Sequence, residues 1–398
     1  MLSRRHLLKL LAGAGAGGFS VINSKAFGQS TLILPKINFW DRQRQGANFF
    51  HRDPREDLFA TARNFGFDFV RLSFEAWASQ HPNFLLGNTD HYRGLVEADK
   101  NYLWRILGLA QRYAVPILIC PLTLPGSQFQ ANAALDKEDN RLWQDPKFWQ
   151  YAADYWRDLA LFLRDHPIVY GYDLLNEPHP ERLTKKPVGD QVSLPAWQQE
   201  YLGTTADLNL FYQLVIKHIR QVDSWTPIII ESGFDANPQA FINLEPVQDS
   251  RVLYSFHQYQ PWVYTTAEEF RGQFCYPGQV TAWGQTENWD KKQLQKSVAQ
   301  VILWSHRNQI RSRQILIGEI GVHRQACGAF DYLRDNIAIF NEHGWHWAFY
   351  AFREDQWDGM DYELPVDFPE GEYWYDLEQR LSLPRQDTEI FRLFRKQF

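Results

Sequence analysis

Four glutamate residues follow or end apolar runs of the sequence, where a buried strand would deliver a side chain to an open edge. They are Glu75, Glu177, Glu231 and Glu319. Two facing carboxyl groups can cleave a glycosidic bond, because one, kept protonated by a raised pKa, gives its proton to the departing oxygen while the other attacks the sugar carbon. A separation of roughly 5–5.5 Å implies retention through a covalent intermediate, and a wider gap implies inversion by water. A strand-end glutamate is often paired with an arginine, and we expect that structural role for Glu75 and Glu231.

The neighbours of Glu177 and Glu319 indicate that these two form the reacting pair. Asn176 can donate an amide hydrogen bond to a sugar hydroxyl next to the reacting carbon. Gly318 and Gly321 are small, so we expect them to let a substrate approach Glu319 closely. The sequence therefore favours Glu177 and Glu319 as catalytic residues.

Eight short apolar runs recur along the chain, with helical patterns between most of them. Continuous apolar runs are typical of parallel strands that are covered on both faces. The expected strands are Gly46–Phe50, Phe67–Phe74, Val115–Cys120, Ile168–Leu175, Pro227–Ser232, Arg251–His257, Ile315–Ile320 and His346–Phe352. The expected helices are Arg55–Phe65, Glu97–Tyr113, Asp145–Arg164, Thr205–Val222, Lys291–Asn308 and Gly328–Glu342, with a short, weak one near Pro238–Leu244.

This alternation predicts an α/β fold, a (β/α)8 TIM barrel that forms a single catalytic domain over residues 31–398. A doubly wound open sheet is the alternative, and it is disfavoured because no Gly-x-Gly-x-x-Gly turn follows the first strand. In a barrel the chemistry lies at the carboxyl ends of the strands. Glu177 ends the fourth expected strand and Glu319 the seventh, so their side chains can converge across the mouth.

Three motifs in order, "NEP", "YSFHQYQP" and "GEIGV", resemble glycoside hydrolase family 5, the cellulase family of retaining (β/α)8 glycosidases. The resemblance covers nearly all of the chain beyond residue 28. It implies that Glu177 is the general acid/base and Glu319 the nucleophile. It also implies that Asn176 binds the hydroxyl beside the anomeric carbon.

The same resemblance assigns roles to three further residues. Arg71, in "FVRLSFE", would hydrogen-bond the nucleophile and keep its pKa low, as a nearby cation should. His257 and Tyr259 would line the reacting subsite, and Tyr259 would donate its hydroxyl to Glu319.

Two positions depart from the family pattern. Many members carry a histidine after the third strand, where "CPLTLPGSQ" places Leu122. The eighth strand usually ends with a sugar-stacking tryptophan, where this chain has Tyr350, although Trp347 or Trp357 could serve instead. These departures leave the reaction intact, but they leave the identity of the sugar undetermined.

Three histidines, His51, His179 and His323, also fall near strand ends and could together bind zinc. No His-x-His follows the first strand, so we expect hydrogen-bonding roles, and we expect neither a metal nor a cofactor. His179 and Asn48 are further candidates for sugar contact.

Two segments carry residues that could line a cleft. Asp358 and Asp361 lie in an acidic loop after the eighth strand, which could be a substrate loop or a solvated loop and lacks the regular calcium-loop spacing. Trp262 and Trp283 lie in the long segment Gln260–Asp290, which could form a cleft wall or a satellite core.

Residues 1–28 read as a twin-arginine-type signal peptide, with Arg4 and Arg5 before a short apolar run. We expect cleavage near Gly28 and export to the periplasm or the exterior, with a membrane tether as the alternative. The formal net charge of −6 argues against a nucleic-acid partner. Three cysteines allow at most one disulfide.

Together these observations predict an exported, monomeric, retaining β-glycosidase that acts on a β-linked carbohydrate, with endo-β-1,4-glucanase activity as the first expectation. Endo-β-mannanase and exo-β-1,3-glucosidase activities are the near alternatives. A non-catalytic carbohydrate-binding barrel and a zinc hydrolase are the alternatives from other classes. We expect no membrane partner once the signal is removed.

Overall fold

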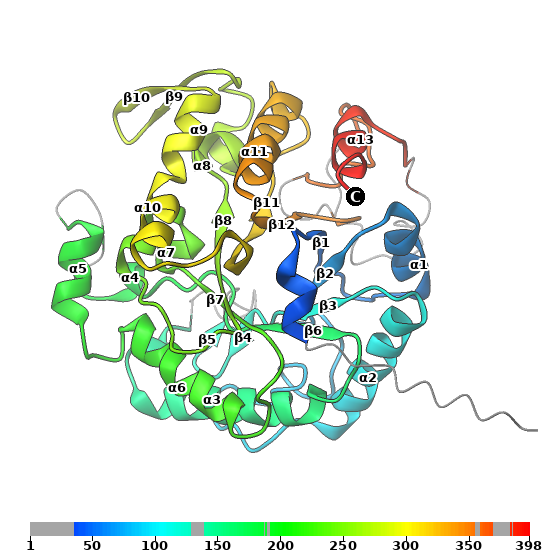
Figure 1. Ribbon diagram of the computed structural model, residues 1–398, viewed down its shortest axis with the longest axis vertical. Helices are drawn as coiled ribbons and strands as arrows, with labels where there is room; N and C mark the ends of the chain where they lie inside the picture. The colour runs from blue at the N-terminus through cyan, green and yellow to red at the C-terminus, as the bar shows by residue number, and fades with distance from the viewer. Residues whose placement is uncertain are drawn as a thin grey trace, which may run out of the picture. The chain divides into compact units, whose positions relative to one another are not determined.

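Eight parallel strands close into a barrel in the computed structural model, with helices around it (Figure 1). The structure describes residues 36–128, 139–186, 188, 192–354, 359–368, 383 and 385–398. The barrel strands, in their order around the ring, are β1 (Gln45–Phe49), β2 (Phe69–Leu72), β3 (Ile117–Ile119), β6 (Val169–Asp173), β7 (Ile228–Glu231), β8 (Val252–Gln258), β11 (Ile315–Ile320) and β12 (His346–Phe349). Because β12 pairs with β1, the ring has no free edge, so the expected TIM barrel is confirmed and the open sheet is wrong.

The helices fall between the strands largely as expected. They are α1 (Glu56–Phe65), α2 (Glu97–Arg112), α3 (Pro146–Leu163), α4 (Pro180–Leu183), α5 (Leu194–Tyr201), α6 (Leu208–Arg220), α7 (Gly233–Ala236), α8 (Trp262–Thr265), α9 (Lys291–Ser297), α10 (Ala299–Arg307), α11 (Ala329–His343) and α13 (Glu389–Arg395). The helix expected from Lys291 to Asn308 is two helices, because the chain leaves helical geometry at Val298. The weak element after β7 is the 3-10 helix Pro238–Asn243.

The interior of the barrel has an apolar layer below a polar one. Six buried apolar side chains, one from each of six strands, make up the lower layer. They are Phe69, Leu118, Ile229, Leu253, Leu316 and Ala348. Side chains alternate between the two faces of a strand, so the residues two positions further on face the same interior. On β2 and β7 these residues are Arg71 and Glu231, and a polar layer therefore lies toward the carboxyl ends.

The amino end of the barrel is closed by Trp40, from the 3-10 helix Lys36–Asp41. Its ring packs on Phe69 at 5.3 Å between centroids, and its Nε1 donates to the backbone oxygen of Tyr170 at 3.1 Å. Since this end is filled, a substrate can enter only at the opposite end, where the carboxyl ends of the strands lie.

The segment after β8 forms an antiparallel hairpin outside the barrel, and a disulfide lies beside it in the sequence. The hairpin strands are β9 (Gly278–Ala282) and β10 (Gln285–Trp289). Cys275 and Cys327 form a disulfide, and Cys120 is buried as a free thiol, in agreement with the limit of one disulfide. A second small hairpin, β4 (Thr123–Leu124) with β5 (Ser127–Gln128), follows β3.

The expected signal over residues 1–28 lies outside the described residues and stays a prediction. Within the part of the chain that the structure covers, no helix has the length and the apolar character that crossing a bilayer requires.

Candidate active site

The centre of the polar layer is the guanidinium of Arg71, which is fully buried and contacts five side chains from β1, β6, β7, β11 and the turn after β6. Its Nε donates to Asp173 at 2.8 Å, and its Nη atoms donate to Asn48 (3.1 Å), Glu319 (2.6 Å), Asn176 (2.7 Å) and Glu231 (2.9 Å). A planar fork with five donors suits such a ring of acceptors. Arg71 therefore joins strands from around the barrel in one hydrogen-bonded network.

Glu319 lies in β11, where the pairing with β8 shifts register between Ile317 and Glu319. A bulge of this kind redirects a side chain, and here it brings the carboxylate toward the open end. Glu319 accepts hydrogen bonds from Arg71 and from the hydroxyl of Tyr259, the latter at 2.8 Å. Burial raises the pKa of Glu319 above its ordinary value, while His257 and Arg71 act to lower it.

Glu177 follows β6 on the opposite side of the mouth, in the left-handed backbone region at φ 47°. This conformation is unusual for a residue with a side chain, and such positions cluster at functional sites. The backbone N–H of Glu177 donates to Glu231 at 2.7 Å, which holds the turn in place. The carboxylate of Glu177 is part-exposed and remains accessible from the mouth.

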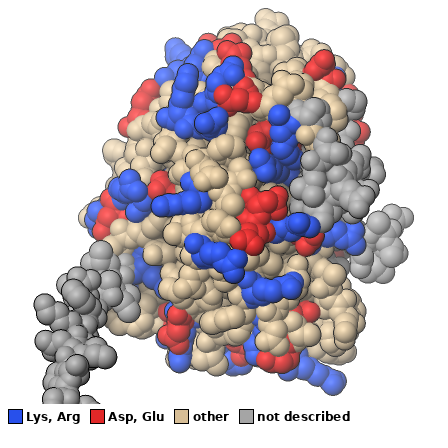
Figure 2. Space-filling view, turned by 90° about the vertical axis from the view of Figure 1, so that its right-hand side faces the viewer, with Lys and Arg blue, Asp and Glu red and all other residues tan. Residues whose placement is uncertain are grey.

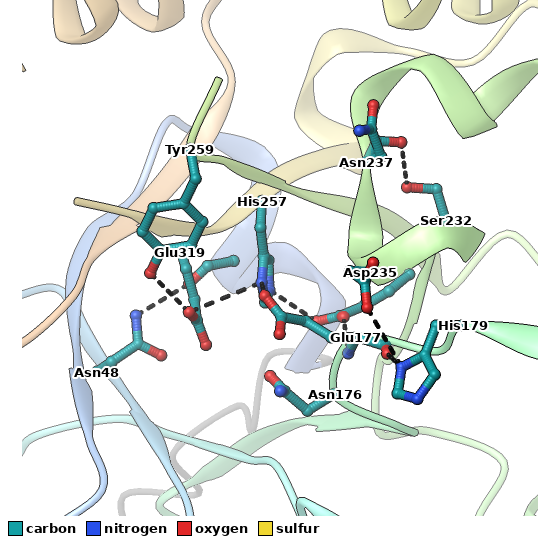
Figure 3. A network of polar contacts seen from close by, with 12 residues as sticks. Asn48, Asn176, Glu177, His179, Ser232, Asp235, Asn237, His257, Tyr259 and Glu319 are labelled. Carbon is teal, nitrogen blue, oxygen red and sulfur yellow. Dashed lines mark hydrogen bonds and ion pairs between the residues drawn. The ribbon is translucent and has the colours of Figure 1, made fainter. Parts of the chain in front are cut away.

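His257, at the end of β8, lies between the two glutamates (Figure 3). Burial alone would lower its pKa, but Glu231 and Glu319 raise the pKa of His257 well above its ordinary value. Both ring nitrogens are therefore donors, Nδ1 to Glu177 at 2.7 Å and Nε2 to Glu231 at 3.1 Å. The imidazolium carries the positive charge that lets three carboxyl groups approach one another here.

The two candidate catalytic carboxylates converge as the sequence predicts. A carboxylate oxygen of Glu177, one of Glu319 and a ring nitrogen of His257 all lie within 4.8 Å of one another. Figure 3 shows these residues and Tyr259 gathered around one point, with Asn176 beside them. Asn176 uses its Oδ1 to accept from Arg71, which leaves its NH2 group to donate to a substrate.

This arrangement can be compared with known proteins. The sequence profile of the cellulase family, glycosyl hydrolase family 5, matches residues 34–356 of the chain. That match spans the whole barrel. The chain belongs to glycosyl hydrolase family 5.

Curated relatives of this family-5 chain are more distant in sequence. Endoglucanase C of Acetivibrio thermocellus is 26% identical over 222 residues, which cover 54% of this chain and 55% of that protein. Endoglucanase C307 of Clostridium sp. (strain F1) is 25% identical over the same length. The chain thus spans about half the length of the curated relatives that it matches.

Solved structures share the fold. A crystal structure titled as a glycoside hydrolase has a TM-score of 0.61 at 17% identity, covering 89% of this chain and 99% of the other. Thermotoga maritima Cel5A, solved in complexes with mannotriose and with cellobiose, has a TM-score of 0.57 at 16% identity over 80% of this chain and 92% of that one. At these identities the similarity establishes the barrel and no more.

Asn48, which the sequence suggested as a sugar contact, is instead a buried support in this family-5 barrel, and Arg71 hydrogen-bonds Glu319 as expected. Arg71 and Asn48 are each 0% exposed. Asn48 accepts from Arg71 and donates to the backbone oxygens of Gly318 and Phe349, at 3.0 and 3.3 Å. Because each of their polar groups is held by the protein, they position Glu319 and do not touch a sugar. The expectation that Arg71 lowers the pKa of Glu319 is right in direction, but burial outweighs it.

The glycines beside Glu319 serve a different purpose from the one expected. A Cβ at Gly318 would lie 2.8 Å from His257 Nε2, and a Cβ at Gly321 would lie 2.5 Å from Met360 Sδ. The missing side chains therefore make room for protein groups that pack around Glu319. They do not widen the path of a substrate.

The aromatic residues considered for the sugar-stacking position at the end of the eighth strand are buried where the structure describes them. Tyr350 is buried and packs edge-to-face on Phe50 at 5.5 Å, so little of its ring can stack on a sugar. Trp347 is fully buried against Phe394 and cannot take that role, and Trp357 lies outside the described residues.

The three histidines considered as zinc ligands do not converge. Among the described residues, the one group of three possible ligands is Glu177, His257 and Glu319. This group is made of the two converging carboxylates and the imidazole between them. His51 contacts the backbone oxygen of Arg353 at 3.1 Å, and His179 contacts that of Glu177 at 2.8 Å.

Glu75 differs from the arginine-paired role expected of it. Its carboxyl group is held by the hydroxyl of Thr123, and no arginine contact of it is found in the described part of the chain. Burial raises the pKa of Glu75 to about 7. Glu75, Leu122 and Thr123 line a small hollow above β2 and β3, at the carboxyl end of the barrel strands.

Two carboxyl groups of the network were missed as functional residues. Glu231 is paired with Arg71 as expected, but it also binds His257 and the backbone N–H of Glu177, so it connects Arg71 to His257 and to the turn that carries Glu177. Asp173 is the last residue of β6; burial raises the pKa of Asp173 to about 7, and the charge of Glu231 acts in the same direction. An acidic residue inside the run "GYDLL" was the signal that could have revealed it.

The remaining candidates lie further out. Asp361 is buried and paired with Arg385 at 2.6 Å, which contradicts a solvated acidic loop at that residue, whereas Asp358 lies outside the described residues. Trp262 is 43% exposed and Trp283 is 82% exposed, so neither belongs to a satellite core.

The hydroxyl of Tyr259 yields a prediction about pH. It stabilises the ionised form of Glu319, so removing it in Tyr259→Phe should raise the pKa of that carboxyl group further. The acidic limb of the kcat/KM profile should then move to higher pH, because that limb reports the free enzyme's essential base. The measurement is kcat/KM for a soluble aryl glycoside between acid and neutral pH.

The matched control is Tyr254→Phe, which removes a hydroxyl from β8, the strand that Tyr259 follows directly. The Tyr254 hydroxyl accepts from the backbone N–H of Val247 at 2.9 Å, away from the network, and its loss should leave the limb in place. If the Tyr259→Phe limb coincides with that of the unaltered enzyme, the hydroxyl does not act on the nucleophile.

Proposed function

We propose that the chain is a retaining β-glycosidase that cleaves β-1,4-linked glucan within the polymer. The observation that carries this proposal is that one carboxylate oxygen of Glu177 and one of Glu319 lie within 4.8 Å of each other at the open end of the barrel. Carboxyl groups about 5–5.5 Å apart favour a covalent intermediate, while inverting enzymes need roughly 6.5–9.5 Å. The names of the curated relatives, both endoglucanases, support an internal cut in a glucan.

In the first step Glu319, ionised and oriented by Arg71 and Tyr259, attacks the anomeric carbon. The bond from that carbon to the leaving oxygen breaks, and its electron pair stays on the oxygen. Glu177, protonated at this stage, delivers its proton to this oxygen, and the Nδ1–H of His257, 2.7 Å away, donates to the carboxylate that the transfer leaves. Asn176 donates its amide to the hydroxyl beside the reacting carbon.

In the second step a water molecule enters from the side that the leaving group vacates. Glu177, now ionised, takes a proton from the water, and the oxygen attacks the anomeric carbon. The bond to Glu319 breaks and its carboxylate is restored. Two displacements at one carbon return the original configuration.

The alternatives from other classes have less support. A non-catalytic barrel would not require two carboxyl groups and an imidazolium together at the open end. Burying each of these charges costs free energy unless it is paired with an opposite charge. On the face drawn in Figure 2, acidic and basic side chains are interspersed, which suits an uncharged substrate better than a nucleic acid. Endo-β-mannanase action stays the near alternative, since a solved structure with the same fold is titled as a complex with mannotriose.

Export through the segment 1–28 is part of the proposal. The disulfide between Cys275 and Cys327 supports it, because disulfides persist mainly outside the reducing cytosol. Replacing Arg4 and Arg5 together by Lys should hold the protein in the cytosol, as judged by cell fractionation. Undiminished export of this variant would contradict a twin-arginine route.

The substrate is tested by product analysis on cello-oligosaccharides, mannan and β-1,3-glucan in parallel. We expect cello-oligosaccharides to be cut internally, with early products of several lengths. Glu319→Gln should lower kcat by about 10⁴-fold or more, because removal of a reacting group leaves only the contribution of binding.

Faster cleavage of mannan or β-1,3-glucan would replace the glucan assignment and leave the mechanism intact. Release of single sugars from one chain end would contradict internal cleavage. Activity of Glu319→Gln close to that of the unaltered enzyme would contradict the nucleophile.

A further inference from the structure

The hairpin β9–β10 projects from the barrel beside α8 and α9 (Figure 1, upper left). Val280 and Trp289, one from each strand, are buried and hold its base on the body of the protein. The disulfide from Cys275 to Cys327 joins the chain before the hairpin to the loop after β11. The hairpin is therefore an anchored element and not a loose loop.

The tip of the hairpin is Trp283-Gly284, and both residues have positive φ, at 47° and 76°. Two-residue hairpin turns with positive φ at both positions favour Asn-Gly or Asp-Gly. A tryptophan there is strained, since its Cβ crowds the backbone. Trp283 is nevertheless 82% exposed, the highest value among the large apolar side chains of the described residues. Packing against the protein therefore does not explain why a tryptophan occupies this turn.

The outer face of the hairpin is polar and uncharged. Thr281 pairs with Thr286 and Gln279 with Asn288, so the period of two places these four side chains on one face. All four are exposed, and the two threonine hydroxyls lie 2.8 Å apart. A flat ring beside a row of amides and hydroxyls matches a neutral, hydroxyl-rich polymer in charge and in hydrogen-bonding character.

The hairpin also follows the end of the barrel at which the candidate active site lies. It follows α8, which begins just after the carboxyl end of β8 that carries His257 and Tyr259. Trp262, the first residue of α8, is 43% exposed. A polymer chain leaving the mouth of the barrel could therefore reach the hairpin without crossing to the amino end.

We propose that Trp283 and the outer face of the β9–β10 hairpin form a second, non-catalytic binding site for a neutral β-linked polysaccharide. The ring stacks on a sugar face, and the amides and hydroxyls of the strands bond to sugar hydroxyls. The site retains the enzyme on long or insoluble chains and takes no part in bond cleavage. This inference rests on the proposed glucan substrate.

The test uses Trp283→Asn, which removes the ring and supplies the residue that the turn prefers. The variant should fold at least as well as the parent, so a loss of binding cannot be attributed to a broken hairpin. Its affinity for microcrystalline cellulose, measured by depletion in the cold, should fall about tenfold, as expected for the loss of a dominant contact. The value of kcat/KM on a soluble aryl β-cellobioside should change by less than about twofold, as for other surface changes.

Two further variants control the measurement. Trp225→Asn removes another exposed tryptophan (65%) that precedes β7 at the amino end of the barrel, and it should leave cellulose binding in place. Trp283→Phe keeps a flat ring and should retain most of the binding. If the parent hydrolyses mannan and not cellulose, the same comparison on mannan tests the hairpin, so failure of the substrate assignment is separable from failure of this inference.

Several results would overturn the inference. Trp283→Asn could bind the polymer as tightly as the parent, or Trp225→Asn could weaken binding equally, which would indicate non-specific adsorption. A parallel loss of kcat/KM on the soluble substrate would place the ring in the catalytic cleft. Loss of a concentration-dependent dimer in Trp283→Asn, measured by sedimentation, would make the ring a contact between copies of the chain.

Discussion

The buried guanidinium of Arg71 is the interaction on which the site depends. It contacts the carboxyl groups of Asp173, Glu231 and Glu319 at 2.6 to 2.9 Å, in an interior where such groups would otherwise repel one another. A buried charge is tolerated only when it is paired and hydrogen-bonded, and removal of one partner is strongly destabilising. Arg71 and the imidazolium of His257 supply the compensating charge. The same contacts that make the interior stable therefore fix the direction of the Glu319 carboxylate.

The barrel makes this arrangement possible through the two-residue period of its strands. Apolar side chains such as Phe69 and Ile229 fill the lower layer, and the next inward position on the same strands carries Arg71 and Glu231. The lower layer gives the polar groups a rigid floor and excludes water from beneath them. At the upper rim the constraint relaxes, because a bulge in β11 and the left-handed backbone at Glu177 turn the carboxylates of Glu319 and Glu177 toward the opening.

The sequence predicted the parts of this account that depend on local pattern. Continuous apolar runs located every barrel strand, and the strand-end rule selected Glu177 and Glu319 from many acidic residues. Features set by tertiary contacts could not be predicted. Whether Glu75 meets an arginine or Thr123 depends on which loops meet above β2 and β3. The part of Glu231 in the network depends on Arg71 from β2, His257 from β8 and the backbone N–H of Glu177. The exposed tip of the β9–β10 hairpin has no periodic signal, because a two-residue turn with tryptophan breaks the usual turn preference.

The central claim is that Glu319 forms a covalent bond to the sugar while Arg71 and Tyr259 hold it in place. The most direct measurement is to trap that bond with an aryl 2-deoxy-2-fluoro-β-cellobioside, whose fluorine slows both steps while its good leaving group lets the first step proceed. Peptide mapping by mass spectrometry should find one sugar adduct per chain, on Glu319. An adduct on another residue would contradict the account, as would the absence of an adduct together with products of inverted configuration.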